Sequence, residues 1–127
     1  MKYLALLLIS AAPIFAHHSF AAEFDAKKPV TLKGTITQLD WTNPHIWLHI
    51  DAKDDAGNVT LWMCEGGNPN TLMRAGWRKD TVKAGDQLTI EGFRAKDGTN
   101  TCNTRSVTFP DGKRVFAGSQ SDGGPQQ

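Results

Sequence analysis

The chain has 127 residues, which is short enough for a single domain. Its 14 Lys and Arg nearly balance its 13 Asp and Glu, and no basic block stands out. This balance argues against a nucleic-acid partner, because such partners are bound by neutralising phosphates.

The N-terminus has the pattern of a secretory signal peptide over residues 1–16. Lys2 supplies the basic start, an uncharged apolar run follows, and Ala16 is a small residue at the cleavage point. The run is shorter than the roughly twenty residues that span a bilayer. We therefore expect a periplasmic or secreted mature chain without a membrane span. Cleavage after Ala21 is the alternative, since it fits the small-residue rule better.

Residues 17–29 form a short N-terminal arm. The arm begins with His17 and His18, and Phe20 and Phe24 follow at a helical spacing. The segment is too short to be a stable helix alone. We expect the two Phe side chains to pin the arm to the domain that follows.

Residues 30–118 have the pattern of a β-rich domain. Alternating apolar residues predict strands at 30–39, 45–52, 59–64, 86–93, 101–109 and 114–117. Gly34, in the middle of the first strand, predicts a sharp bend or bulge. Residues 119–127 hold nothing to bury, and we expect them to be disordered.

The second and third strands alternate, which predicts the two faces of each. In the second, the residues that we expect in the core are Ile46, Leu48 and Ile50, and those that we expect outside are His45, Trp47 and His49. In the third, we expect Val59, Leu61 and Met63 inside, and Thr60, Trp62 and Cys64 outside.

A short helix is predicted after the third strand. Asn68 or Asn70 can cap it, Pro69 suits its first turn, and it should run to Trp77, near Gly76. Three strands, a helix and two further strands are the layout of a small OB-fold-like β-barrel. The fold class is thus all-β with one short helix. An all-β sandwich is the main rival, but it would not need a helix there.

Cys64 and Cys102 are the only cysteines. An even pair in an exported chain favours a disulfide. Two free thiols or a soft-metal site are the alternatives.

Several motifs in order resemble those of a family of small exported bacterial proteins catalogued only as a domain of unknown function. They are His-His-Ser-Phe-Ala-Ala-Glu-Phe-Asp, Trp-Thr-Asn-Pro-His, Glu-Gly-Gly-Asn-Pro-Asn, Arg-Ala-Gly-Trp and Ala-Lys-Asp-Gly-Thr-Asn. The resemblance covers essentially the whole mature chain and implies an exported single domain, but no activity. It includes the His pair, which favours cleavage before His17. The family pattern does not require Cys64 and Cys102.

Histidines at the mature N-terminus suggest a metal site. His17 and His18 would place an α-amine and two imidazoles in one dipeptide, a nitrogen-rich set that copper(II) favours. His45 and His49 lie roughly 13–14 Å apart on one strand, so only one of them, His45, should join the site. Glu65 or Asp25 could add an oxygen ligand. The alternative is that these histidines only form hydrogen bonds with neighbours.

The outward side of the second and third strands suggests a binding face. We expect it to hold Trp47 and Trp62, with His49 and Glu65 beside them, because OB folds bind ligands there. The alternative is that the arm covers these rings, or that a Trp closes the end of the barrel.

No pattern of residues suggests catalysis, and we expect a non-enzymatic module. Cys64 has no evident base partner, and Gly66-Gly67 lacks the rest of a phosphate loop. The leading hypothesis is an exported binding or accessory module that takes copper, or a similar metal, as its only cofactor. The alternative is a metal-free module whose Trp-lined face docks a periplasmic protein or small ligand.

Overall fold

Six β-strands and two short helices form the part of the chain that this computed structural model describes, residues 19–119 and 122–125. The predicted signal peptide, His17 and His18 lie outside that part. In chain order the elements are α1 (Phe20–Glu23), β1 (Phe24–Asp40), β2 (Trp47–Lys53), β3 (Val59–Glu65), α2 (Pro69–Arg74), β4 (Gln87–Ala95), β5 (Thr101–Thr108) and β6 (Arg114–Phe116). Among the described residues, no helix is long and apolar enough to cross a membrane.

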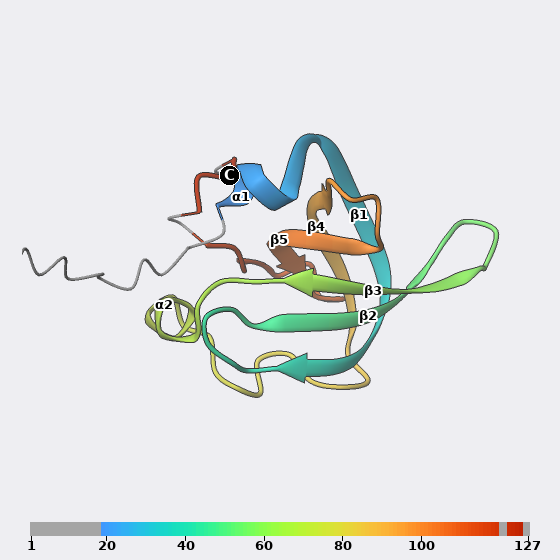
Figure 1. The fold of residues 1–127 in the computed structure, drawn as a ribbon. Helices are drawn as coiled ribbons and strands as arrows, with labels where there is room; N and C mark the ends of the chain where they lie inside the picture. Colours follow the sequence, from blue (N-terminus) through green and yellow to red (C-terminus); the bar gives the residue numbers. More distant parts are fainter. Residues whose placement is uncertain (1–18, 120–121, 126–127) are drawn as a thin grey trace, which may run out of the picture.

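The strands close into a ring (Figure 1). Antiparallel ladders follow the order β3-β2-β1-β4-β5-β6, and a parallel pairing of β3 with β5 closes the circuit. Five strands in this connectivity, with α2 between β3 and β4, make an OB-fold-like barrel. The predicted fold class is therefore confirmed, and the sandwich alternative is wrong. The structure adds a second helix, α1, of four residues.

The long strand β1 serves both sides of the ring. At Gly34 it pairs with β2 and β4 at once. A Cβ on Gly34 would overlap the carbonyl oxygen of Asp51, so this close approach of two backbones requires glycine. The irregularity in the ladder with β2 comes slightly later than predicted, between Ile36 and Gln38.

The alternation predicted for the second strand is confirmed. Ile46, Leu48 and Ile50 are completely buried in the barrel core. Trp47 and His49 lie on the opposite face and are half-buried. The hydrophobic effect therefore fixes which way this strand faces.

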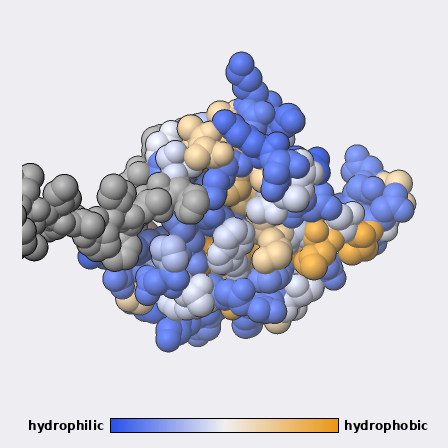
Figure 2. All heavy atoms as spheres, in the orientation of Figure 1, coloured by the Kyte–Doolittle hydropathy of each residue, from blue (hydrophilic) through white to orange (hydrophobic). Residues whose placement is uncertain are grey.

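The faces predicted for the third strand are wrong. Val59, Leu61 and Met63 are 60%, 52% and 40% exposed, whereas Cys64 is fully buried and Trp62 packs against the core. The exposed side chains form an apolar strip along β3, in the β2–β3 hairpin (Figure 2).

Pairing with β2 and a disulfide explain the phase of β3. Cys64 lies opposite the core residue Leu48 in the β2–β3 ladder, and directly opposite residues share a face of a sheet. Cys64 is also bonded to Cys102 inside the barrel, with their Cα atoms 4.5 Å apart. The predicted disulfide is thus confirmed. Because successive side chains of a strand point to opposite faces, the buried position of Cys64 decides which face each other side chain of β3 occupies.

The N-terminal arm packs on the barrel as predicted. Phe20 and Phe24 are each 4% exposed and form a small separate core with Ala95 and Phe93. The rings of Phe20 and Phe93 meet edge to face at 5.6 Å. The arm is partly strand, because β1 begins at Phe24.

The helix after the third strand is shorter than predicted. The Asn68 side chain caps it by accepting a hydrogen bond from the Thr71 N–H, and the helix ends at Arg74 rather than at Trp77. Of the tail predicted to be disordered, residues 119 and 122–125 are described, and there Asp122 bonds to the barrel and to α1.

Candidate functional site

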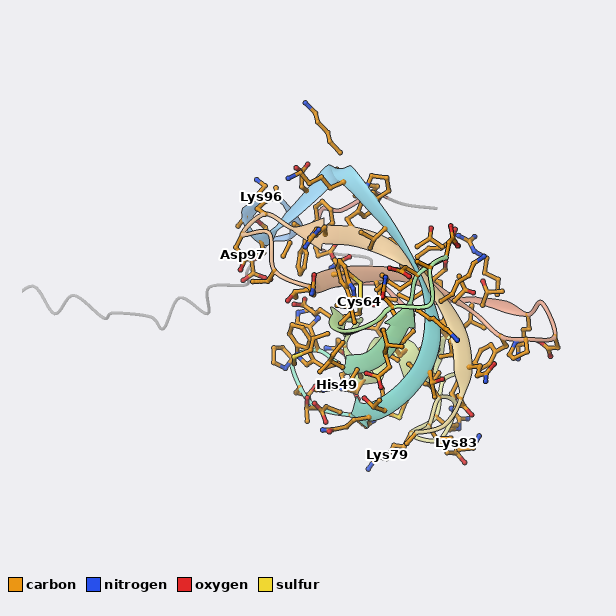
Figure 3. All side chains as sticks on the ribbon, turned by 90° about the vertical axis from the view of Figure 1, so that its right-hand side faces the viewer. His49, Cys64, Lys79, Lys83, Lys96 and Asp97 are labelled. Atoms are coloured by element: carbon orange, nitrogen blue, oxygen red, sulfur yellow. A yellow bond between two sulfur atoms is a disulfide. The ribbon has the colours of Figure 1, made fainter. Side chains whose placement is uncertain are left out.

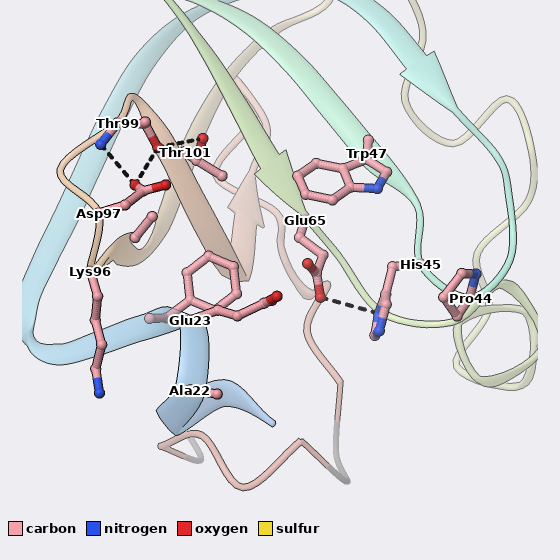
Figure 4. Close-up of a pocket in the computed structure, with 12 residues that line it drawn as sticks. Ala22, Glu23, Pro44, His45, Trp47, Glu65, Lys96, Asp97, Thr99 and Thr101 are labelled. Atoms are coloured by element: carbon pink, nitrogen blue, oxygen red, sulfur yellow. Dashed lines mark hydrogen bonds and ion pairs between the residues drawn. The ribbon is translucent and has the colours of Figure 1, made fainter. Parts of the chain in front are cut away.

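A pocket of about 630 Å³ lies on the outer face of β2 and β3. It sits between loop 41–46, which joins β1 to β2, and loop 96–100, which joins β4 to β5. OB-fold barrels bind their ligands on this face and between these two loops. The lining residues are Ala22, Glu23, Phe24, Pro44, His45, Trp47, Glu65, Ala95, Lys96, Asp97, Thr99 and Thr101 (Figure 4).

The N-terminal helix α1 forms one wall of the pocket. The backbone N–H of Lys96 donates to the carbonyl of Glu23 at 2.8 Å, and the Lys96 ammonium donates to the carbonyl of Ala21. These two bonds join α1 to the loop after β4. The arm and the barrel therefore enclose the pocket together.

His45 lies on the opposite wall, in a defined tautomer. Its Nδ1 is 2.9 Å from the carbonyl oxygen of Gly66 and 3.5 Å from Oε1 of Glu65. Because a carbonyl oxygen only accepts hydrogen bonds, Nδ1 carries the proton. In the neutral ring, Nε2 then keeps its lone pair, which is the arrangement in which a histidine binds a metal ion.

Acidic side chains outnumber basic ones in the lining of the pocket. Glu23, Glu65 and Asp97 contribute carboxylates, and Lys96 is the one lysine or arginine among the described lining residues. In Figure 4 the carboxylate of Glu23 points toward the side of the pocket that holds Glu65 and His45. Such a surface favours a cation or a ligand with donor groups over an anion.

Hydrogen bonds within loop 96–100 keep Asp97 ionised. Its Oδ1 accepts from the Thr99 hydroxyl at 2.6 Å and from the Thr99 N–H at 2.9 Å. The hydroxyl, followed by the N–H, lowers the pKa of Asp97 below its usual value of 3.8. The loop thus keeps a negative charge at the pocket rim.

His49, which the sequence predicts beside Trp47, lies outside this pocket. Its Nε2 is 2.8 Å from Oδ2 of Asp40. Hydrogen bonds from the Gln38 side chain first, and then from His49, lower the pKa of Asp40. Figure 3 shows His49 well away from the loop that carries Lys96 and Asp97. His49 therefore belongs to a separate pair.

Trp62 also lies apart from Trp47. It stands opposite the core residue Ile50 and packs against the core, and the guanidinium of Arg94 lies 5.1 Å from its ring centroid. A single face lined by both tryptophans does not form. Trp47 alone lines the pocket, with Glu65 paired to it across the two strands.

The predicted metal ligands are only partly described. No cluster of three or more His, Cys, Asp or Glu that could hold a metal occurs within residues 19–119 and 122–125. His17 and His18 lie outside these ranges, so their half of the predicted site is not described. Asp25, the alternative oxygen ligand, accepts from the Lys27 N–H at 2.9 Å and does not line the pocket.

The pocket includes several residues that the sequence analysis did not single out. Glu23 comes from the arm, and Lys96, Asp97 and Thr99 come from the loop between β4 and β5. The sequence pattern carries one signal for the loop residues, since the same loop lines the binding face in other OB-fold barrels. Glu23 has no such signal, because its place depends on how α1 packs.

Comparisons with known proteins match one family. A model described as a family of unknown function, DUF6152, matches residues 5–104. Neither the curated proteins nor the solved structures give a significant match.

Proposed function

The chain belongs to this family of unknown function, and we propose that it is an exported periplasmic binding module for a copper-type ion. The proposed ligands are the α-amine and imidazoles at His17 and His18, the Nε2 of His45, and the carboxylate of Glu65. The buried disulfide is compatible with an oxidising compartment outside the cytoplasm.

One observation carries this proposal: the arm and His45 line the same pocket. Only Ser19 separates His18 from α1. Consecutive residues advance at most about 3.6 Å, so the His18 backbone stays within roughly 7 Å of Phe20. This short link to α1 favours a site that the His pair shares with His45.

The chemistry of the donors favours copper(II) over harder ions. Neutral imidazoles and a free amine suit copper, nickel and zinc, and copper binds most tightly among the divalent first-row metals. The hydrogen bond from Nδ1 to the carbonyl of Gly66 orients the ring of His45. It leaves the lone pair of Nε2 available to bind the metal ion. The nearby carboxylates offset the charge of the ion.

The test uses protein secreted with its natural N-terminus, which is verified by N-terminal sequencing. Copper(II) titration, followed by visible absorption and electron paramagnetic resonance, should show nitrogen ligation. We expect His45→Gln to weaken binding about tenfold or more, and His17→Ala/His45→Ala to change the spectrum.

The matched control is His49→Gln, because His49 is on the same strand face but is paired with Asp40 away from the pocket. It should bind copper like the wild type. A natural chain that starts at Ala22 would refute the N-terminal site. So would a double variant at His17 and His45 whose spectrum and affinity are unchanged.

A metal-free docking module is the second candidate. Trp47 in the pocket and the strip of Val59, Leu61 and Met63 on β3 favour it, because exposed apolar side chains on one face suit a protein or small-ligand partner. Trp47→Ala should then abolish capture of a partner from periplasmic extract without changing the fold. Equal capture by the variant would exclude Trp47 from docking.

A further inference from the structure

A second polar site lies under α1, around a buried arginine. Arg105 of β5 is 1% exposed, and its guanidinium lies 5.0 Å from the ring centroid of Phe20. An arginine stays protonated in a protein, so this cation must be compensated inside the structure. The compensation comes from the C-terminal segment rather than from the barrel.

The carboxylate of Asp122 occupies the space beside this arginine. Oδ1 is 3.3 Å from Nη2 of Arg105 and accepts from the Gly124 N–H at 2.9 Å. Oδ2 accepts from the Asn103 side chain at 3.3 Å. The Asp122 side chain is 8% exposed, so a charged residue in a Gly-rich tail is almost fully withdrawn from water.

The surroundings of Asp122 offer more polar atoms than its carboxylate uses. Buried atoms without a hydrogen-bond partner in the described chain are Nε of Arg105, Oδ1 of Asn103 and Oγ1 of Thr104. Gly124 lies so close that a Cβ there would overlap the guanidinium. This buried cluster around Arg105, which we call the Arg105 site, thus has a spare N–H donor for an anion.

Asp122 also ties the tail to α1. Its backbone carbonyl accepts from the N–H of Phe20 at 2.8 Å. Phe20 begins the helix whose next residues line the pocket, and its ring covers Arg105. One residue of the tail therefore connects a buried cation to the pocket wall.

We infer that the Arg105 site is a carboxylate-binding site, that Asp122 occupies it as an internal ligand, and that this contact latches α1 against the barrel. A carboxylate is the matching ligand because the guanidinium and the Asn103 amide both donate hydrogen bonds. In a variant whose residue 122 has no carboxylate, a small free carboxylate should occupy the same position. This inference does not depend on what the pocket binds.

The test compares full-length wild type, Asp122→Ala, and the control Asp111→Ala. Asp111 is an exposed aspartate whose carboxylate bonds to a backbone N–H in the turn before β6. We expect Asp122→Ala to lower Tm by about 5–15 °C in chloride, because it leaves a buried cation uncompensated. About 200 mM acetate, in place of chloride at equal ionic strength, should restore much of that loss.

Hydrogen exchange tests whether Asp122 holds α1 against the barrel. The amides of Phe20 and Lys96 hold α1 to the tail and to the barrel, so both should exchange about tenfold faster in Asp122→Ala. Acetate should slow the exchange of Lys96 again. The Asp111→Ala control should match the wild type in Tm and exchange, in either salt.

Two results would overturn the inference. One is an Asp122→Ala variant with the Tm and exchange rates of the wild type. The other is an acetate effect that is absent, or equal in the wild type and the variant. If Asp122→Ala does not fold in chloride, its folding is followed by circular dichroism as acetate replaces chloride at equal ionic strength. A variant that stays unfolded in acetate as it does in chloride refutes the site.

Discussion

Removing the disulfide should cost this barrel more stability than any single surface change. The bond joins residues 38 apart in sequence, Cys64 and Cys102. The chain-entropy relation for a closed loop of this length gives about 4 kcal/mol at 25 °C. For a domain of about one hundred residues, this corresponds to a fall in Tm of about 15–20 °C.

The position of the bond explains why the loss should also loosen the barrel. It lies in the parallel ladder of β3 with β5, which runs only from Met63 to Glu65 on the β3 side and closes the ring. Glu65 and Thr101, which line the pocket, are at this closure. Breaking the bond should therefore reduce protection from hydrogen exchange at the pocket as well.

The assay is thermal unfolding, followed by circular dichroism, of three samples: oxidised wild type, reduced wild type, and Cys64→Ala/Cys102→Ala. Reduced wild type keeps both sulfur side chains, so it separates the covalent bond from packing. Both altered samples should melt well below the oxidised protein. A reduced wild type that melts within about 3 °C of the oxidised protein would refute the reasoning.

Three further predictions test the fold and its charges. Gly34→Ala should lower stability by about 2 kcal/mol or more in urea unfolding, because its Cβ would overlap a carbonyl of β2. Equal midpoints would contradict this. Leu48→Ala should cost about 2–5 kcal/mol, whereas Leu61→Ala should cost less than about 1 kcal/mol, since Leu61 is exposed. A cost of about 2 kcal/mol or more for Leu61→Ala would contradict the observed faces of β3. The lowered pKa of Asp40 means that its ionised form adds stability above the usual value of 3.8, and that this contribution disappears as the pH falls through the lowered value. NMR titration should place its midpoint below that of an exposed aspartate, and a midpoint at or above 3.8 would contradict it.

The local patterns of the sequence are enough to predict the order of the six strands and of α2. Strict alternation at Ile46, Leu48 and Ile50 identifies a strand with one buried face, and all three residues are fully buried. The Asn68-Pro69 pair marks the start of α2, because a cap and a proline act within one turn. These signals work because their physical causes lie within a few residues of chain.

The phase of β3 could not be predicted in this way. Apolar residues stand on both of its faces, with Val59 and Leu61 on one and Trp62 and Cys64 on the other. Alternation alone is then equally consistent with either face of β3 being buried. The disulfide to Cys102 and the register with β2 choose between them, and both are contacts between distant segments.

Some residues of the candidate site could likewise be predicted from local sequence, and others depend on contacts between distant segments. His45, Trp47 and Glu65 could be predicted because they flank two strands that the sequence identifies, and they do share a pocket. Glu23 could not, since its place depends on how α1 packs, and the one sequence signal for Asp97 is the place of its loop in the OB-fold layout. His49 and Trp62 were expected there, but a hydrogen bond with Asp40 holds His49 elsewhere, and Trp62 packs against the core.

The sequence by itself thus determined the fold class, the cysteine pairing and the strand that carries His45 and Trp47. Each of these follows from short-range periodicity, turn chemistry or the count of one residue type. The tertiary structure alone decided which face of β3 is buried, and that the arm and loop 96–100 complete the pocket. It also decided that Asp122 of the tail compensates Arg105. These depend on closure of the ring, which brings residues far apart in sequence within contact distance.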